Sequence, residues 1–153
     1  MAGRNPDSNV IVGEIITALQ AVTEAGGYNY DITAANVHDW LEEGSLDLAD
    51  ETTHFDVRDE RSSQDEEDGV YENTLEIHIT ILKAGKTDAT LRTVIRKTMQ
   101  DVLQCMYNDF LPSSTARKID YRGTEPVFDR EGKLMGGADM VFDVIYKTNK
   151  GQI

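Results

Sequence analysis

The pattern of apolar and polar positions is clearest between Thr74 and Met106. Its first part alternates, with apolar residues at every second position: Leu75, Ile77, Ile79 and Ile81. A period of two is typical of a strand with one buried face. Its second part has one apolar helical sector, made of Leu91, Val94, Ile95, Met99, Val102, Leu103 and Met106. This spacing predicts an amphipathic helix, with Thr87 as its N-cap and a turn over residues 83–86 before it.

Helical spacing also marks the N-terminal part of the chain. One apolar stripe is made of Ile11, Ile15, Leu19 and Val22. It predicts a helix that is capped by Ser8 or Asn9, runs to about Glu24 and ends at Gly26-Gly27. Residues 28–32 are then expected to be extended.

A brief second helix is expected between Thr33, as its cap, and Gly44, because Val37, Trp40 and Leu41 recur at helical spacing. The simplest interpretation of Trp40 is a core residue, since large aromatic side chains are mostly buried. The alternative is a contact between subunits, where tryptophan is also enriched.

Residues 54–60 alternate as well, and we expect them to pair with residues 75–81 as a hairpin whose long acidic loop covers about residues 60–72. Two registers keep the apolar face intact. Phe55 opposite Ile77 places Asp56 against Glu76, which is a like-charge pair. Phe55 opposite Ile79 places Arg58 against Glu76 and Asp56 against His78. Cross-strand pairs contribute about 0.2–1 kcal/mol each, so the second register is favoured.

Two late strands complete the expected fold, over residues 119–128 and 140–147. Pro126 favours an edge position for the first of them. The prediction is an α+β domain over residues 1–153, with an antiparallel sheet of about four strands and two long helices packed on one face. The other face is polar, so it is expected to meet water or another subunit. Flexible ends are expected at about residues 1–7 and 148–153.

Charge divides the chain into two unequal halves. The net charge is −13 over 153 residues. Residues 1–75 carry 3 basic and 18 acidic side chains, whereas residues 76–153 carry 12 basic and 10 acidic ones. The acidic half is therefore not a phosphate-binding surface, and it is either a solubilising face or a surface for a basic partner. No apolar run approaches the roughly 20 residues that span a bilayer, so no membrane association is expected.

Catalytic and metal-binding motifs are not found. The single cysteine, Cys105, excludes an intrachain disulfide. His54 and His78 are possible diagonal neighbours, but no cysteine or HExxH spacing accompanies them, so polar strand positions explain them better than zinc. The acidic run QDEEDG starts like an EF-hand loop, yet Leu75 stands where the bidentate glutamate belongs. No serine lies in a GxSxG context. The sequence predicts a protein that is not an enzyme and has no cofactor or metal.

The order of segments resembles that of the tail terminator, or tail-completion, proteins of long-tailed bacteriophages. The resemblance rests on the N-terminal helix that ends before GGYNYDIT, the strand LEIHITIL, the helix ATLRTVIRKTMQDVL and the closing strand MVFDVIYKTN. In that family the last strand typically ends in an aromatic-x-Thr pattern, which Tyr146-Lys147-Thr148 matches. The similarity covers nearly the whole chain, but the acidic insert between Asp59 and Glu72 is longer than the pattern requires.

This resemblance implies a structural virion protein, assembled in the host cytoplasm, with no active site and no cofactor. Such proteins form a ring, commonly a hexamer, at the head-proximal end of the tail tube, where they stop tube growth and join the tail to the connector. The implied partners are further copies of the chain, the tail tube protein and the head–tail connector or neck proteins. Genomic DNA passes through the lumen without specific binding, and an acidic lumen would repel its phosphates.

Two other functions stay open at this point. One is a related neck or head-completion ring protein, which shares a small α+β architecture. The other is a DNA-mimic inhibitor, which rests on charge alone. For the ring, the candidate interaction residues lie on the acidic hairpin tip and on the polar sheet face. They are Asp65, Glu66, Glu67 and Asp68 of the tip, and Asp56, Arg58, Glu76 and His78 of the face.

Overall fold

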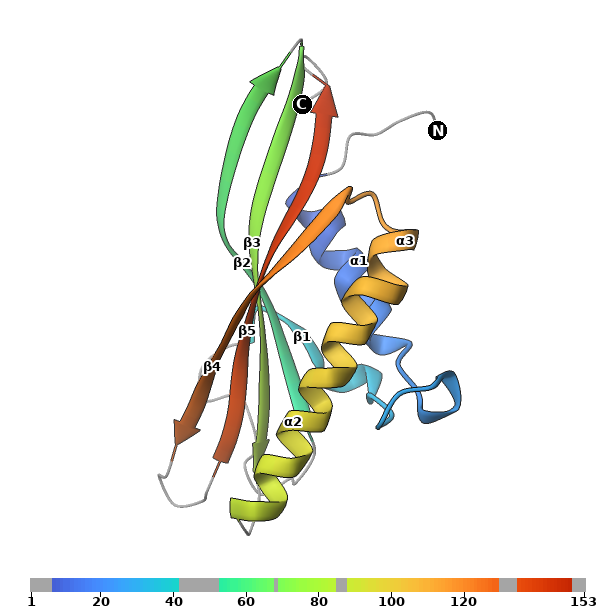
Figure 1. Ribbon diagram of the computed structural model, residues 1–153, viewed down its shortest axis with the longest axis vertical. Helices are drawn as coiled ribbons and strands as arrows, with labels where there is room; N and C mark the ends of the chain where they lie inside the picture. The colour runs from blue at the N-terminus through green and yellow to red at the C-terminus, as the bar shows by residue number, and fades with distance from the viewer. Residues whose placement is uncertain (1–6, 42–52, 68, 85–87, 130–134, 150–153) are drawn as a thin grey trace.

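A five-stranded sheet with helices on one side forms the protein, as the computed structural model in Figure 1 shows. It describes residues 7–41, 53–67, 69–84, 88–129 and 135–149. The strands are β1 (Val37–Asp39), β2 (Thr53–Glu67), β3 (Val70–Ala84), β4 (Lys118–Asp129) and β5 (Met135–Asn149). Their order in the sheet is β1-β2-β3-β5-β4. The helices are α1 (Ser8–Gln20), α2 (Asp88–Gln104) and the short α3 (Leu111–Ser113), with a π-helical turn, Cys105–Phe110, between α2 and α3.

The predicted α+β class is confirmed, but the prediction of about four antiparallel strands is wrong. The sheet is mixed, because β1 runs parallel to β2 while the other neighbours are antiparallel. One hydrophobic core joins α1 and α2 to the sheet. Its fully buried members include Ile15, Ile79 and Phe142. The alternation of apolar residues along β3 and β5 directs one face of each strand into this core.

The hairpin of β2 and β3 is much longer than expected, and the predicted acidic loop over residues 60–72 is wrong. Pairing continues to Glu67 opposite Val70, so only Asp68 and Gly69 connect the strands. Gly69 has a φ of 79°. Asp-Gly is a strong signal for a two-residue hairpin turn, because such turns need positive φ values. The acidic residues before it therefore belong to a strand.

The register also differs from both alternatives. Phe55 lies opposite Ile81, and a bulge at Glu60 shifts the pairing between Asp59 and Arg61. Arg58 consequently lies opposite His78 rather than Glu76. The cross-strand charge pairs did not decide the register, because Arg58 makes its ion pair within its own strand, with Asp56 at 2.6 Å.

Helix α1 begins and ends earlier than predicted. Asp7, and not Ser8 or Asn9, caps it by accepting a hydrogen bond from the Val10 amide at 3.0 Å. Residues 28–32 are irregular rather than a strand. They are held by the buried Asp101 of α2, whose two carboxylate oxygens accept from the Asn29 and Tyr30 amides at 2.8 and 3.1 Å.

The brief helix expected through Trp40 does not form. Residues 34–36 make one 3-10 turn, and the chain then enters β1 beside β2. Trp40 follows with a φ of 55° and is 52% exposed, so the interpretation of Trp40 as a core residue is wrong. The predicted stop at Gly44 and the predicted cap at Thr87 lie outside the described residues.

The C-terminal strands are longer than predicted and the edge position of β4 is confirmed. Thr148 and Asn149, expected to be flexible, pair with Tyr71 and Val70 of β3. Among the described residues, no helix is long and apolar enough to cross a membrane.

Candidate functional site

The far ends of β2, β3 and β5 form a three-stranded extension that we call the β-arm, made of residues 61–67, 70–74 and 146–149. In Figure 1 these strands continue at the top past the ends of the helices. In the described part of the chain, β1 pairs only with residues 55–57 of β2, and β4 reaches only Ile145 of β5. Both edges of the β-arm therefore present backbone groups without a neighbouring strand.

A polar ladder holds the β-arm together where apolar packing stops. Gln64 donates from Nε2 to Asn73 Oδ1 at 2.8 Å. Asn73 donates from Nδ2 to Thr148 Oγ1 at 3.0 Å. The three residues lie on β2, β3 and β5, so the ladder crosses all three strands. Asn73 is only 7% exposed, and its amide is fully used there, as a buried polar group requires.

The predicted acidic tip becomes part of the β-arm. Asp65 and Glu66 are exposed on β2, and Glu67 is its last residue. Asp68 lies outside the described residues. Asp65 is directly opposite Glu72 of β3. Like charges in this position destabilise a strand pair, and Lys147 of β5 offsets the effect from the other side of Glu72.

The polar face of the sheet carries a connected charge network around His78. Its Nδ1 lies 2.9 Å from Asp139 Oδ2, and its Nε2 lies 3.1 Å from Glu76 Oε2. Arg122 of β4 lies 3.5 Å from Glu76 and 3.6 Å from Asp143. Burial opposes protonation of His78, but the hydrogen bonds to Asp139 and Glu76 outweigh it and raise the pKa of His78 above 6.5.

We expect this raised pKa to make stability depend on pH. The folded state binds the His78 proton more tightly than the unfolded state, so its stabilisation is complete below pH 6.5 and is lost as the pH rises through the folded pKa. The variant His78→Gln should flatten this dependence in the pH range above 6.5. Denaturant midpoints across that range measure the effect. An equally steep pH dependence in His78→Gln would assign it to other groups.

Asp56 and Arg58 are on the same face as His78 but serve a different purpose. Asp56 accepts from the Leu41 amide at 2.8 Å, and Arg58 donates to the Leu41 carbonyl. The Arg58 guanidinium lies 4.9 Å from the Trp40 ring centre. Trp40 donates from Nε1 to Asp59 at 3.1 Å. The pair therefore fixes the chain after β1, and Trp40 is held flat against an arginine on the surface.

The histidines do not form a shared site. His38 and His54 stack, with ring nitrogens 3.1 Å apart, whereas His78 bonds to Asp139 and Glu76. The alternation of β3 indicated His78 as a polar face position, but Asp139 and Arg122 were missed. Asp139 lies before the predicted start of its strand, and only the pairing of β4, β5 and β3 brings these residues together. Among the described residues, no group of three or more His, Cys, Asp or Glu is arranged to hold a metal ion.

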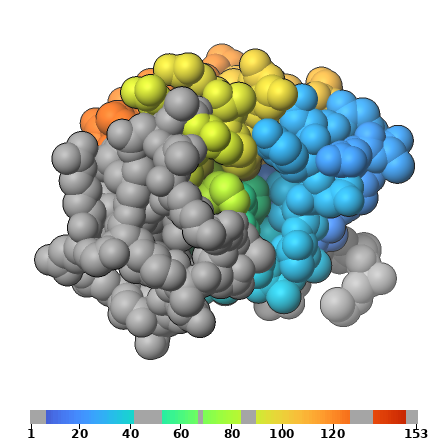
Figure 2. Space-filling view, turned by 90° about the horizontal axis from the view of Figure 1, so that it is seen from below, coloured from blue at the N-terminus to red at the C-terminus, as the bar shows by residue number. Residues whose placement is uncertain are grey.

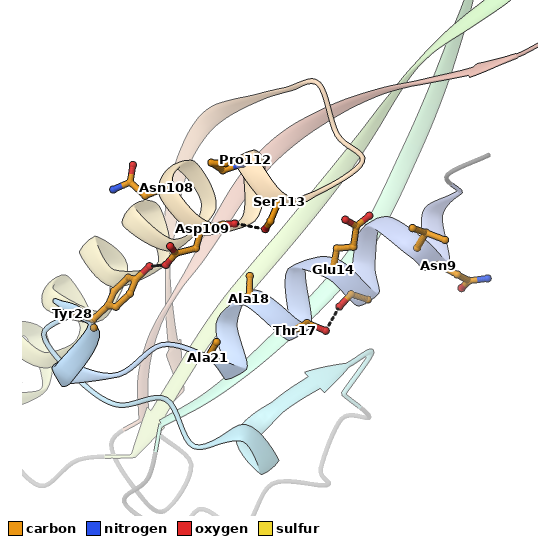
Figure 3. Close-up of a pocket in the computed structure, with 13 residues that line it drawn as sticks. Asn9, Glu14, Thr17, Ala18, Ala21, Tyr28, Asn108, Asp109, Pro112 and Ser113 are labelled. Atoms are coloured by element: carbon orange, nitrogen blue, oxygen red, sulfur yellow. Dashed lines mark hydrogen bonds between the residues drawn. The ribbon is translucent and has the colours of Figure 1, made fainter. Parts of the chain in front are cut away.

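A groove lies between α1 and the π-helical turn (Figure 3). It is an open groove of about 1030 Å³. Tyr28 donates its hydroxyl to Asp109 on one side, and Glu14 accepts from the Thr115 amide and hydroxyl at 3.0 and 2.7 Å. Burial, together with the hydrogen bond to Asp109, raises the pKa of Tyr28. These bonds tie α1 and the loop after it to the π-helical turn and to the segment after α3.

Cys105 lies beside this groove, fully buried at the start of the π-helical turn. Burial first, and then the nearby Asp109 carboxylate, raise the pKa of Cys105 to about 12. The thiol is therefore neutral at physiological pH and is not an activated nucleophile. The arrangement around the groove stabilises a helix junction.

The backbone edges of the arm, its acidic side chains and the exposed Trp40 are features of contact surfaces. Comparison with models of known protein families finds no match, and no curated protein is significantly similar in sequence.

Proposed function

We propose that this chain is the subunit of a ring at the head-proximal end of a bacteriophage tail tube, where it ends tube polymerisation and joins the tail to the head connector. The β-arm is the observation that carries this proposal. The extension has two edges that lack a neighbouring strand among the described residues, and such edges promote unwanted pairing when nothing covers them. It is useful where neighbouring subunits cover it in an assembly.

The rest of the molecule supports a scaffold role. The strand and helix that first carried the resemblance, β3 and α2, are central to the core, with Ile79 and Val102 fully buried. In the proposed ring, the polar face around His78 and Arg122 meets a partner layer. Its carboxylates outnumber its cations, so such a face lining a lumen would repel DNA rather than bind it. The virion is therefore the proposed location.

The oligomeric state tests the ring directly. We expect the purified chain to form a closed cyclic oligomer, measured by light scattering after gel filtration and by class averages of negatively stained particles. Interfaces in such a ring should bury more than crystal contacts do, so the ring should persist on dilution. A chain that stays monomeric under all conditions, including with tail tubes present, would contradict the proposal.

A binding experiment distinguishes the tail terminator from the related neck or head-completion protein. A tail terminator should bind the ends of tail tubes, whereas a head-completion protein should bind the capsid portal. We expect the chain to sediment with purified tubes and not with empty, portal-bearing capsids. Binding to capsids alone would favour the neck protein.

A further inference from the structure

An apolar groove with a basic rim lies at the end of the molecule opposite the β-arm. It lies between α2 and the β4–β5 edge of the sheet, and its volume is about 340 Å³. Leu91, Ile95, Met99 and Ala138 supply apolar lining, and Arg92 and Arg96 stand beside them. Gly136 also lines the groove, and an added Cβ there would lie 2.8 Å from the Leu91 side chain, so the glycine lets Leu91 pack closely against β5.

The rim of this groove is the cationic surface of α2. Arg92 and Arg96 line the groove and are exposed. Neither makes an ion pair with a residue that the structure describes. Asp101 of the same helix is buried and bonded to the loop after α1, so it does not neutralise them. Figure 2 looks onto this end of the molecule and shows α2 (yellow-green to yellow) along its upper surface.

The β-arm has the complementary pattern on one of its faces. Val70 and Glu72 are two residues apart on β3, so they share a face, and Asp65 lies directly opposite Glu72. Lys147 of β5 lies on the other side of Glu72. By sequence, residues 61–74 carry five acidic side chains and one basic one. The face therefore presents one apolar side chain beside two carboxylates and one lysine, where the groove presents an apolar surface beside two guanidinium groups.

The two surfaces cannot meet within one molecule. In Figure 1 the arm is at the top, and the first turns of α2 are at the bottom. The contact therefore needs a second copy. A contact between two different surfaces of identical subunits is head-to-tail, and it closes into a ring when the rotation between subunits allows it.

We infer that the β-arm of one subunit docks in the groove of the next, with Val70 over the apolar lining and with Asp65 and Glu72 beside Arg92 and Arg96. This inference rests on the proposed ring and names its subunit contact. The contact places a cation next to Asp65 and adds a second cation beside Glu72, which already lies opposite Lys147. It also covers the apolar groove and gives the β-arm a partner.

Charge reversal of each side, alone and together, tests the contact. The groove variant is Arg92→Glu with Arg96→Glu, and the arm variant is Asp65→Lys with Glu72→Lys. Each alone should raise the concentration for half-assembly at least about tenfold, because like charges then face each other. The chain with all four substitutions should assemble again near the wild-type concentration, which is the signature of a direct pair.

Control experiments separate loss of the contact from unfolding and from a charge change elsewhere on the surface. Circular dichroism should show all variants folded, since the four side chains are exposed. The matched control, Arg117→Glu with Lys118→Glu, makes the same charge change at exposed sites outside the groove and should leave assembly unchanged. If the wild type assembles and the groove variant assembles equally well, or the fourfold variant is not restored, the inference is wrong while the proposed function stands.

Two further outcomes are decisive. If the groove variant forms normal rings that no longer bind tail tubes, the groove binds the tube protein and the inferred subunit contact is wrong. A wild type that never assembles would instead contradict the ring itself.

Discussion

Replacing Ile79 with aspartate is expected to unfold the protein. Ile79 is fully buried in β3, with Val57 of β2 on one side and Met140 of β5 on the other. An aspartate there would lose the apolar burial and place an unpaired charge among these side chains. We expect a loss of at least about 5 kcal/mol, which is comparable to the whole stability of many domains.

The matched control keeps the position and removes one methylene group. Ile79→Val should cost about 1 kcal/mol and leave the fold intact. Denaturant unfolding followed by circular dichroism measures both variants, together with the soluble fraction after expression. A folded Ile79→Asp chain with a midpoint near the wild-type value would show that this face of β3 is not the core.

A methyl group at Gly137 is expected to be nearly as damaging. Gly137 of β5 pairs with Leu82 of β3, and an added Cβ would lie 2.0 Å from the Ile81 carbonyl oxygen. That oxygen is backbone in the central strand, so it cannot move without disturbing the sheet. We therefore expect Gly137→Ala to cost about 3 kcal/mol, at the upper end for overpacking.

Gly13 provides the opposite case in the same chain. It lies within α1, is exposed, and an added Cβ would meet no atom within 4 Å. Alanine is a better helix former there, so Gly13→Ala should stabilise the protein by about 0.5–1 kcal/mol. Thermal or denaturant unfolding of the two variants should thus shift in opposite directions. Equal shifts would refute the steric argument for Gly137.

The parts of the fold that were predictable are those with strong apolar periodicity. Alternation over Leu75–Ile81 and the helical stripe of α2 are local patterns that follow directly from burial of one face in the core. Both elements are present. The same periodicity could not reveal β1, which has only three residues and is defined by its pairing with β2. Trp40 was misjudged for the same reason, since its position depends on Arg58 and Asp59 of another strand.

The candidate site was harder to predict because it is polar. The strands continue through SSQDEE without apolar alternation, and their pairing is sustained by the ladder of Gln64, Asn73 and Thr148. A long-range ladder leaves no periodic signal in one sequence. The Asp68-Gly69 dipeptide was the available signal for a tight hairpin. In the sequence, the only sign of the groove beside α2 was the arginines on the polar side of that helix. Its other wall comes from β4 and β5, which are distant in sequence.

The account depends most on where this chain sits, and electron microscopy of tail tubes tests that directly. Tube protein polymerised alone should give tubes of variable length with bare ends. With this chain added, we predict shorter tubes that each carry a closed ring at one end, with its density fitted by the five-stranded subunit. Tubes that grow to the same lengths with bare ends, while the chain stays free in solution, would contradict the account.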